Sequence, residues 1–225
     1  APARRVALTT FSRFPVLARH TATWSWLWQP GWSRRHHERF YGRATDPYGF
    51  ETAPEQAKYR ETLSLLGDQG VGRALEVGAS EGSFTEMLLP LCDELVASDV
   101  SEVALSRARA RLGEHPGLSF ERRTFPLDLP DGTFDLIVVS DVAYFWAEDV
   151  LELGLRLMAE RLRPGGRMLL LHYRGDFRAP VTGDAVHDRG VAIAHELAFE
   201  LDADIVFQHR GPHDAGYRAD IIRRP

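Results

Sequence analysis

From residue 70 onward, short apolar runs alternate with stretches of helical periodicity. The runs that predict strands cover 73–78, 94–99, 118–123, 134–140 and 166–173. The last two are nearly continuous in hydrophobic residues, as expected for parallel strands buried on both faces. Helices are expected between the strands, over about 82–91, 101–113 and 147–162. This alternation predicts an α/β fold: a doubly wound, Rossmann-like parallel sheet with right-handed crossovers and helices on both faces.

The C-terminal part of the pattern differs from this alternation. A helix is expected over about 184–200, followed by two strands within ADIVFQHR (203–210) and YRADIIRR (217–224). The turn at 211–216 makes these two strands a hairpin, which would place an antiparallel strand in the sheet. Upstream, helices are expected outside the sheet at 33–44 and 54–66.

The first 45 residues differ from the rest in charge and aromatic content. They hold eight arginines and one acid, a charge of +7, which leaves −12 for the remaining 180 residues and the total of −5. They also hold Trp24, Trp26, Trp28 and Trp32. Such an arm can bind nucleic acid or an anionic ligand. We favour a packing arm whose tryptophans cover an apolar surface, and packing on a second subunit would make a homodimer.

At 225 residues the chain suits one α/β domain with an extension. We divide it into a basic, Trp-rich N-terminal arm with a covering helix (1–45) and a main domain (46–225). No run approaches the roughly 18 apolar residues that a membrane span requires. Arg13, Pro15 and Arg19 interrupt the first apolar stretch, so we expect a cytoplasmic protein without a signal peptide. The lone Cys92 excludes an internal disulfide and a multi-cysteine zinc site.

The segment EVGASEG connects the first strand to the first helix of the alternating region. It spells E-x-G-x-x-x-G, with Glu76 ending the strand, Gly78 in the turn and Gly82 near the start of the helix. Dinucleotide folds prefer G-x-G-x-x-G, and the lysine of a P-loop is missing. The wider spacing is typical of S-adenosylmethionine sites, where the backbone approaches the methionyl and ribose parts. An ordinary structural turn is the alternative.

Two further strand ends carry polar residues. Asp99 follows the loop by about twenty residues and ends the second strand, where a carboxylate can accept both ribose hydroxyls. Alternatively, Asp99 or Ser101 caps the following helix. The fourth strand ends in Ser140 and Asp141, beside the expected cofactor crevice. Pro164, Gly165 and Gly166 are expected to terminate a helix before the fifth strand.

Residues 73–172 resemble a class I S-adenosylmethionine-dependent methyltransferase, with EVGASEG, ASDVS, FDLIVVSDV and LRPGGRMLLLHY in the familiar order. More closely, the chain resembles the nodulation protein S (NodS) group over roughly 38–223. The segments that carry this resemblance are DPYGFETAPEQAKYRETL (46–63), SDVAYF (140–145), HYR (172–174) and TGDAVH (182–187). The resemblance implies the strand order 3-2-1-4-5-7-6 with strand seven antiparallel. It also implies S-adenosyl-L-methionine as the donor and N-methylation of a glucosamine.

The resemblance and the motifs together assign a cofactor site. Its expected residues are Glu76, Gly78, Ala79, Ser80, Gly82, Asp99, Val100, Thr124, Phe125 and Ser140. Thr124 stands where relatives often have an acidic residue that meets the adenine amino group. Adenine recognition is therefore open between Thr124, the backbone near Phe125, and Asp128. Only Asp141 is clearly placed as a carboxylate at the catalytic edge, so no metal is expected.

Methyl transfer from a sulfonium is an in-line displacement, and an ammonium acceptor must lose a proton before it attacks. We expect His172 to take that proton, and Asp141 and Tyr144 to position the acceptor and the sulfonium. The alternatives are a hydrogen-bonded structural role for His172 and a core position for Tyr144. We expect Tyr48, Arg174 and His187 to contact the acceptor. Lys58 is expected to pair with Glu55, the other option being the cofactor carboxylate.

We therefore expect a methyltransferase that acts on a small-molecule acceptor, the amine of an amino sugar or glycoside. An O-methyltransferase of a sugar or aromatic natural product is the alternative. An RNA methyltransferase is disfavoured because SDVAYF is not the N/D-P-P-Y signature and Cys92 sits poorly for attack on cytosine. A non-catalytic S-adenosylmethionine-binding subunit would retain the glycine loop and Asp99 but lose the polar residues after the fourth and fifth strands.

Overall fold

The computed structural model describes residues 34–67, 69–207 and 214–225. The tryptophan-rich part of the N-terminal arm and most of the turn between the last two strands lie outside the described residues. The packing expected for the tryptophans of the arm therefore stays a prediction.

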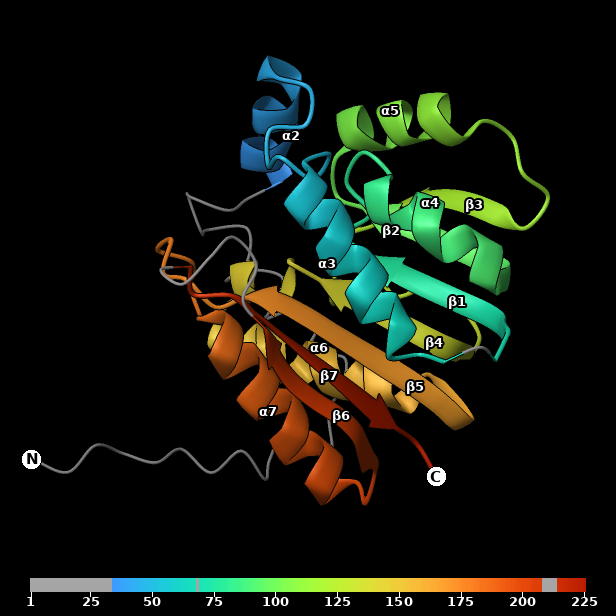
Figure 1. The fold of residues 1–225 in the computed structure, drawn as a ribbon, viewed down its shortest axis with the longest axis vertical. Coiled ribbons are helices and arrows are strands. Elements are labelled where there is room, and N and C mark those ends of the chain that lie inside the picture. Colours follow the sequence, from blue (N-terminus) through green and yellow to red (C-terminus); the bar gives the residue numbers. More distant parts are fainter. Residues whose placement is uncertain (1–33, 68, 208–213) are drawn as a thin grey trace, which may run out of the picture.

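The described residues form a seven-stranded sheet in the order β3-β2-β1-β4-β5-β7-β6 (Figure 1). Its strands are β1 (Val71–Val77), β2 (Cys92–Asp99), β3 (Leu118–Arg122), β4 (Phe134–Ser140), β5 (Leu162–Tyr173), β6 (Glu200–Phe207) and β7 (Tyr217–Arg223). All neighbours pair in parallel except β7, which is antiparallel to both β5 and β6. The predicted fold class and strand order are confirmed.

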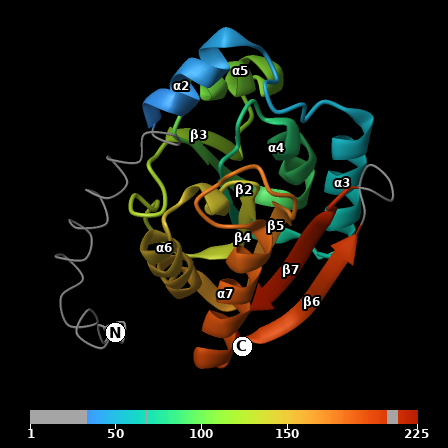
Figure 2. The same cartoon turned by 90° about the vertical axis from the view of Figure 1, so that its left-hand side faces the viewer.

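Helices cover both faces of this sheet (Figures 1 and 2). They are α2 (Arg34–Arg43), α3 (Ala53–Ser64), α4 (Ser83–Leu88), α5 (Glu102–Leu112), α6 (Glu148–Glu160) and α7 (Gly183–Glu196), with the 3-10 turns η2 (Leu89–Leu91) and η3 (Ala143–Phe145). Successive β4 residues alternate between the two faces. Ile137 and Val139 pack in the cluster that holds α6 and α7, and Leu136 and Val138 pack in the cluster that holds α3 and α4.

Three element boundaries differ from the sequence expectation. The helix after β1 ends at Leu88 and continues as the 3-10 turn η2, because Pro90 cannot donate the hydrogen bond that would prolong an α-helix. Helix α6 ends at Glu160, and β5 already begins at Leu162. The Pro164–Gly166 segment thus lies inside an irregular start of β5, where the pairing with β4 shifts between Phe134 and Leu136.

The C-terminal helix is also shorter than expected. It ends at Glu196, and β6 begins at Glu200. In the part of the chain that the structure describes, no helix has the length and apolar character needed to span a membrane.

Candidate active site

A cavity of about 320 Å³ lies at the carboxyl ends of the central strands. Its floor comes from the residues that end β1, β2 and β4, and further wall residues follow β5 or begin β7. Residues 34–52, which we call the covering segment, contribute His37, Tyr41, Tyr48 and Phe50 from the opposite side. The cavity is thus shared between the sheet and a segment that precedes it in the chain.

The glycine loop stays close to the sheet and leaves space above the end of β1. Gly78 has a φ of 82°, and a Cβ on it would lie 3.0 Å from the Cβ of Val142. The amides of Gly78 and Ala79 donate to the carbonyl of Ser98 at 2.8 and 2.9 Å. Gly82 also has positive φ, and its Cβ would meet Ala108 of α5 at 3.1 Å. Side chains at either glycine would strain the turn and crowd its neighbours.

Asp99 is the last residue of β2, lies beside this loop and lines the cavity. Its Oδ2 accepts from the amide of Ser80 at 2.9 Å, and its Oδ1 accepts from the amide of Ser101 at 2.8 Å. Burial raises the pKa of Asp99 to about 6, although these amide hydrogen bonds oppose the rise. The hydroxyl of Ser101 caps α5 by accepting from the amide of Ala104. Ser101 thus caps the helix, whereas Asp99, whose carboxylate is held by backbone amides, lines the cavity.

Glu76 has a supporting position below the loop. Its Oε2 accepts from the hydroxyl of Thr85 in α4 at 2.6 Å, which joins the end of β1 to the following helix. Burial raises the pKa of Glu76 to about 7. Glu76 does not line the 320 Å³ cavity, but it lines a small pocket that shares Gly78 and Ser80 with it. Glu76 thus holds the loop, and its expected contact with the cofactor stays a prediction.

The cavity end beyond Asp99 is lined by Val100, Phe125 and Arg123. Of the three options for adenine recognition, only Phe125 lines the cavity, and Thr124 and Asp128 do not. The carboxylate of Asp128 instead accepts from the guanidinium of Arg123 at 2.8 Å. Arg123 could not be found from the sequence, because nothing in its local pattern separates it from the other arginines.

The opposite end of the cavity is organised around Asp141. This residue follows β4 with a φ of 51°, and its Oδ1 accepts from the amide of Tyr173 at 2.9 Å and the hydroxyl of Tyr144 at 3.2 Å. Its Oδ2 accepts from Lys58 Nζ at 2.8 Å, and Lys58 Nζ also lies 2.7 Å from Glu55 Oε2. The expected Lys58–Glu55 pair is present. The contact with Asp141 was not expected, because 83 residues separate the partners.

Aromatic rings enclose this end. The rings of Tyr48 and Phe50 stack with centroids 5.4 Å apart, and Tyr144 contacts Phe177 edge-on at 4.7 Å. The hydroxyl of Tyr48 lies 3.3 Å from Nδ1 of His37. Burial raises the pKa of Tyr144 and of Tyr48 above the ordinary value, so both phenols keep their protons. Tyr48 lines the cavity, as its expected contact with the acceptor requires, and Ser140 also lines it.

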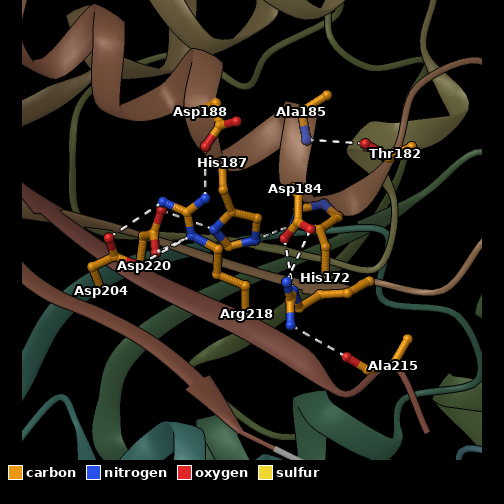
Figure 3. Close-up of polar contacts among 11 residues, drawn as sticks. His172, Thr182, Asp184, Ala185, His187, Asp188, Asp204, Ala215, Arg218 and Asp220 are labelled. Carbon is orange, nitrogen blue, oxygen red and sulfur yellow. Dashed lines mark hydrogen bonds and ion pairs between the residues drawn. The ribbon is translucent and has the colours of Figure 1, made fainter.

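His172 and His187 are not placed as expected. Figure 3 shows them in a chain of polar contacts, and neither side chain is exposed to solvent. His172 Nε2 accepts from the amide of Ala143 at 3.3 Å, and its Nδ1 lies 3.2 Å from Nε2 of His187. His187 Nδ1 in turn lies 2.9 Å from Oδ2 of Asp220. Neither histidine lines the cavity.

The proton positions in this chain can be assigned from the amide. Because a backbone N–H can only donate, His172 Nε2 carries no proton, so the proton of the neutral ring is on Nδ1, toward His187. His187 then accepts at Nε2 and carries its own proton on Nδ1, which faces Asp220. Burial lowers the pKa of His172 well below its ordinary value and that of His187 to about 3. His172 therefore has no free lone pair for an acceptor's proton, which corrects our assignment of it as the base.

Arg174 is likewise outside the cavity. Its guanidinium donates to both carboxylate oxygens of Asp184 at 2.8 and 3.2 Å, on the outer side of α7. The N-cap of α7 is Thr182, whose hydroxyl accepts from the amide of Ala185. An acceptor contact through Arg174 or His187 is thus not supported by the positions of these side chains.

The covering segment is fixed to the sheet side by residues that sequence reasoning missed. The hydroxyl of Tyr41 donates to Ser80 Oγ at 2.7 Å, directly beside the glycine loop. The guanidinium of Arg107 in α5 donates to the carbonyls of Tyr41 and Ala44 and pairs with Glu81. These partners lie too far apart in sequence for a local signal to reveal the contact.

Comparison with known proteins adds a family assignment. The model of the family described as nodulation protein S (NodS) matches residues 39–198. Nodulation protein S of Bradyrhizobium diazoefficiens is 37% identical over 123 residues, which are 53% of this chain and 58% of the relative. The aligned part thus spans little more than half the length of that curated relative.

Solved structures share the fold. The crystal structure of N-methyltransferase NodS from Bradyrhizobium japonicum WM9 in complex with S-adenosyl-L-homocysteine superposes with a TM-score of 0.74 at 23% identity, over 85% of this chain and 98% of that chain. The crystal structure of the glycopeptide N-methyltransferase MtfA superposes with a TM-score of 0.61 at 18% identity, over 78% of this chain and 92% of that one.

Proposed function

The chain belongs to the nodulation protein S (NodS) family, and from this premise we propose that it is an S-adenosylmethionine-dependent methyltransferase. We propose further that its acceptor is a small molecule carrying an amine, such as an amino sugar or glycoside. The observation that carries the proposal is one cavity with Asp99 at one end and the Asp141 cluster, enclosed by aromatic rings, at the other.

The residues at the first end fit the cofactor. Asp99 lines the cavity with its carboxylate held by backbone amides, and a carboxylate at this strand end suits a pair of ribose hydroxyls. Val100 and Phe125 supply apolar walls for an adenine ring. Gly78 keeps the floor free of side-chain atoms. When bound there, S-adenosylmethionine supplies a methyl group activated by a sulfonium.

The residues at the second end fit an amine. The Asp141 carboxylate has roughly four lone-pair positions. Three of them accept from Tyr173, Tyr144 and Lys58, and together these hydrogen bonds hold the carboxylate in one orientation. The remaining position on Oδ2 can accept the N–H of an acceptor and receive its proton. Asp141 thereby takes the role that we had expected of His172. The surrounding rings exclude water and can cover the apolar face of a sugar.

The alternative acceptors are less well supported by this geometry. A sugar hydroxyl needs a stronger and well-aligned base than an amine does, and the lone pair of His172 is already engaged by Ala143. A base within an RNA chain would have to enter beneath the covering segment. A subunit that only binds the cofactor would not need a fixed carboxylate such as Asp141 at the acceptor end.

The first experiment is calorimetric titration with S-adenosylhomocysteine. We expect micromolar affinity, and a loss of about tenfold or more in Asp99→Ala, since hydrogen bonds to charged groups contribute about 1.5–3 kcal/mol. Asp93→Ala is the matched control, because Asp93 is exposed on the same strand. Transfer of labelled methyl to amine-bearing and hydroxyl-only sugars then identifies the acceptor class. A well-folded protein that does not bind S-adenosylhomocysteine would contradict the proposal.

A further inference from the structure

The only lysine in the chain is also one of its most buried residues. The sequence uses arginine 26 times and lysine once, and the side chain of Lys58 is 0% exposed. Burying an ammonium is expensive unless several partners replace its water. The groups around position 58 must therefore compensate a buried cation, and their arrangement must suit an ammonium.

The surroundings of Lys58 explain why that cation is a lysine. Its Nζ lies 2.7 Å from Glu55 Oε2 and 2.8 Å from Asp141 Oδ2. It also lies 4.1 Å from the ring centroid of Tyr217 and 4.5 Å from that of Tyr59. A compact ammonium can direct its three N–H groups to two carboxylates and an aromatic face, whereas the larger guanidinium of arginine directs all of its N–H groups within one plane.

Lys58 lies behind the cavity wall, and both of its carboxylate partners line the cavity. Glu55 comes from α3 and also accepts from the hydroxyl of Tyr217 at 3.0 Å. Asp141 comes from the turn after β4. One ammonium thus holds together two acidic groups from distant parts of the chain, at the end of the cavity where the proposed acceptor would lie.

The formal charges of the three groups sum to −1: Glu55 and Asp141 contribute −2 and Lys58 contributes +1. In a buried site this single negative charge favours a ligand with one positive charge and disfavours a neutral one. Without Lys58 the two carboxylates would repel each other and one would have to take up a proton. The lysine therefore determines both the charge of this end and the orientation of Asp141.

We propose that Lys58 is a positioning residue that sets the charge of the acceptor end to −1 and thereby makes the site selective for monocationic amines over neutral acceptors. The inference rests on the proposed function and adds the feature that distinguishes an amine from a hydroxyl. Because Lys58 does not line the cavity, it acts through Glu55 and Asp141.

The charge count makes an unusual prediction for a pair of variants. Glu55→Gln changes the net charge from −1 to 0, and adding Lys58→Met returns it to −1. The double variant should therefore recover the selectivity that the single variant loses. A lysine that merely fastens α3 to the sheet would make the double variant worse than the single one.

The test measures selectivity separately from cofactor binding. Each protein is first titrated with S-adenosylhomocysteine, and we expect affinities within about threefold of the original protein. The loaded protein is then titrated with an N-acetylglucosamine trisaccharide in which a single residue carries a free amine, and with its fully N-acetylated form. The original protein should prefer the amine by about tenfold or more. Glu55→Gln should lose that preference, and Glu55→Gln with Lys58→Met should recover it to within about threefold.

The matched control is Glu61→Gln, which removes a charge from an exposed position of the same helix and should leave the preference unchanged. A double variant no more selective than Glu55→Gln overturns the inference. So does an original protein that binds S-adenosylhomocysteine but shows no preference for the amine. Failure to bind S-adenosylhomocysteine at all would instead defeat the proposed function.

Discussion

Asp99 shows what a single residue reveals in sequence and what it does not. Its place at the end of β2, about twenty residues after a glycine loop, predicts a ribose-binding carboxylate, and the structure places it in the cavity wall. Only the structure shows that Ser101, and not Asp99, caps α5.

His172 is the opposite case. Its position at the end of β5 suggested a base, but side-chain direction and the engagement of Nε2 by Ala143 cannot be deduced from position in a strand.

The raised pKa of Asp99 predicts a pH dependence of cofactor affinity. Ribose hydroxyls donate to the carboxylate, so binding requires Asp99 in its ionised form. Since the pKa in the free protein is about 6, the affinity for S-adenosylhomocysteine should be constant above pH 7 and fall below pH 6, by up to about tenfold per pH unit. Calorimetric titration between pH 5 and 8 measures this, and Asp99→Asn should be weaker and flat across the range. An original protein with no decline below pH 6 would contradict the assignment.

At the scale of elements, periodicity located nearly all of the strands and helices in the described residues. The predicted element boundaries were wrong where a residue type is compatible with two kinds of backbone structure. Pro164–Gly166 is typical of a turn, but the chain extends through it as the irregular start of β5. The contacts between elements could be predicted from the sequence even less well than the element boundaries. The chain Ala143–His172–His187–Asp220 joins η3, β5, α7 and β7, and no local pattern pairs residues so far apart.

This chain of elements predicts how stability responds to acid. The pKa of His187 falls from 6.5 to about 3 on folding, so between these values the unfolded chain binds a proton that the folded one does not. The free energy of unfolding therefore falls as the pH drops below about 6.5. Asp99 and Glu76 act in the opposite direction, because burial raises their pKa values and the folded state binds the extra proton.

Comparison with a variant isolates the histidine. His187→Gln keeps an acceptor and a donor but cannot be protonated, so it removes the pH dependence that His187 contributes. It should be less stable than the original protein at pH 7, because the amide does not fill the buried site of the imidazole ring. The difference should narrow by up to about 1.4 kcal/mol per pH unit between pH 6 and 5. Urea denaturation at each pH measures both free energies of unfolding. A difference that stays constant would show that His187 is protonated in the folded state.

At the scale of the whole molecule, the site combines two parts of different origin. The cofactor end is built by successive strand-to-helix turns of the sheet, and the motifs of those turns are local and readable. The acceptor end also needs α3, the covering segment and β7, which meet only when the chain is folded. This is why the sequence predicted Gly78, Asp99 and Ser140 in the cavity wall but missed Tyr41, Glu55 and Tyr217.

Residues 1–33, the part of the N-terminal arm that contains the four tryptophans, carry a prediction for the assembly. Four tryptophans bury large apolar areas when they find a partner surface, on the order of 150–250 Å² each, and we propose that this partner is a second copy of the chain. Deletion of residues 1–33 should then halve the mass measured by light scattering and leave the circular dichroism spectrum unchanged. An undeleted chain that is already monomeric, or a deletion that unfolds, would count against the dimer.

The burial of Lys58 also affects how this protein can be handled. Every other cation in the sequence is an arginine or a histidine, so the folded chain offers no side-chain amine on its surface. Reagents that acylate or crosslink amines will therefore find no lysine to modify in the folded chain. The same fact makes Lys58 a natural reporter. Its acylation requires the region around α3 to open, so the rate of modification at this one residue measures how often the acceptor end comes apart.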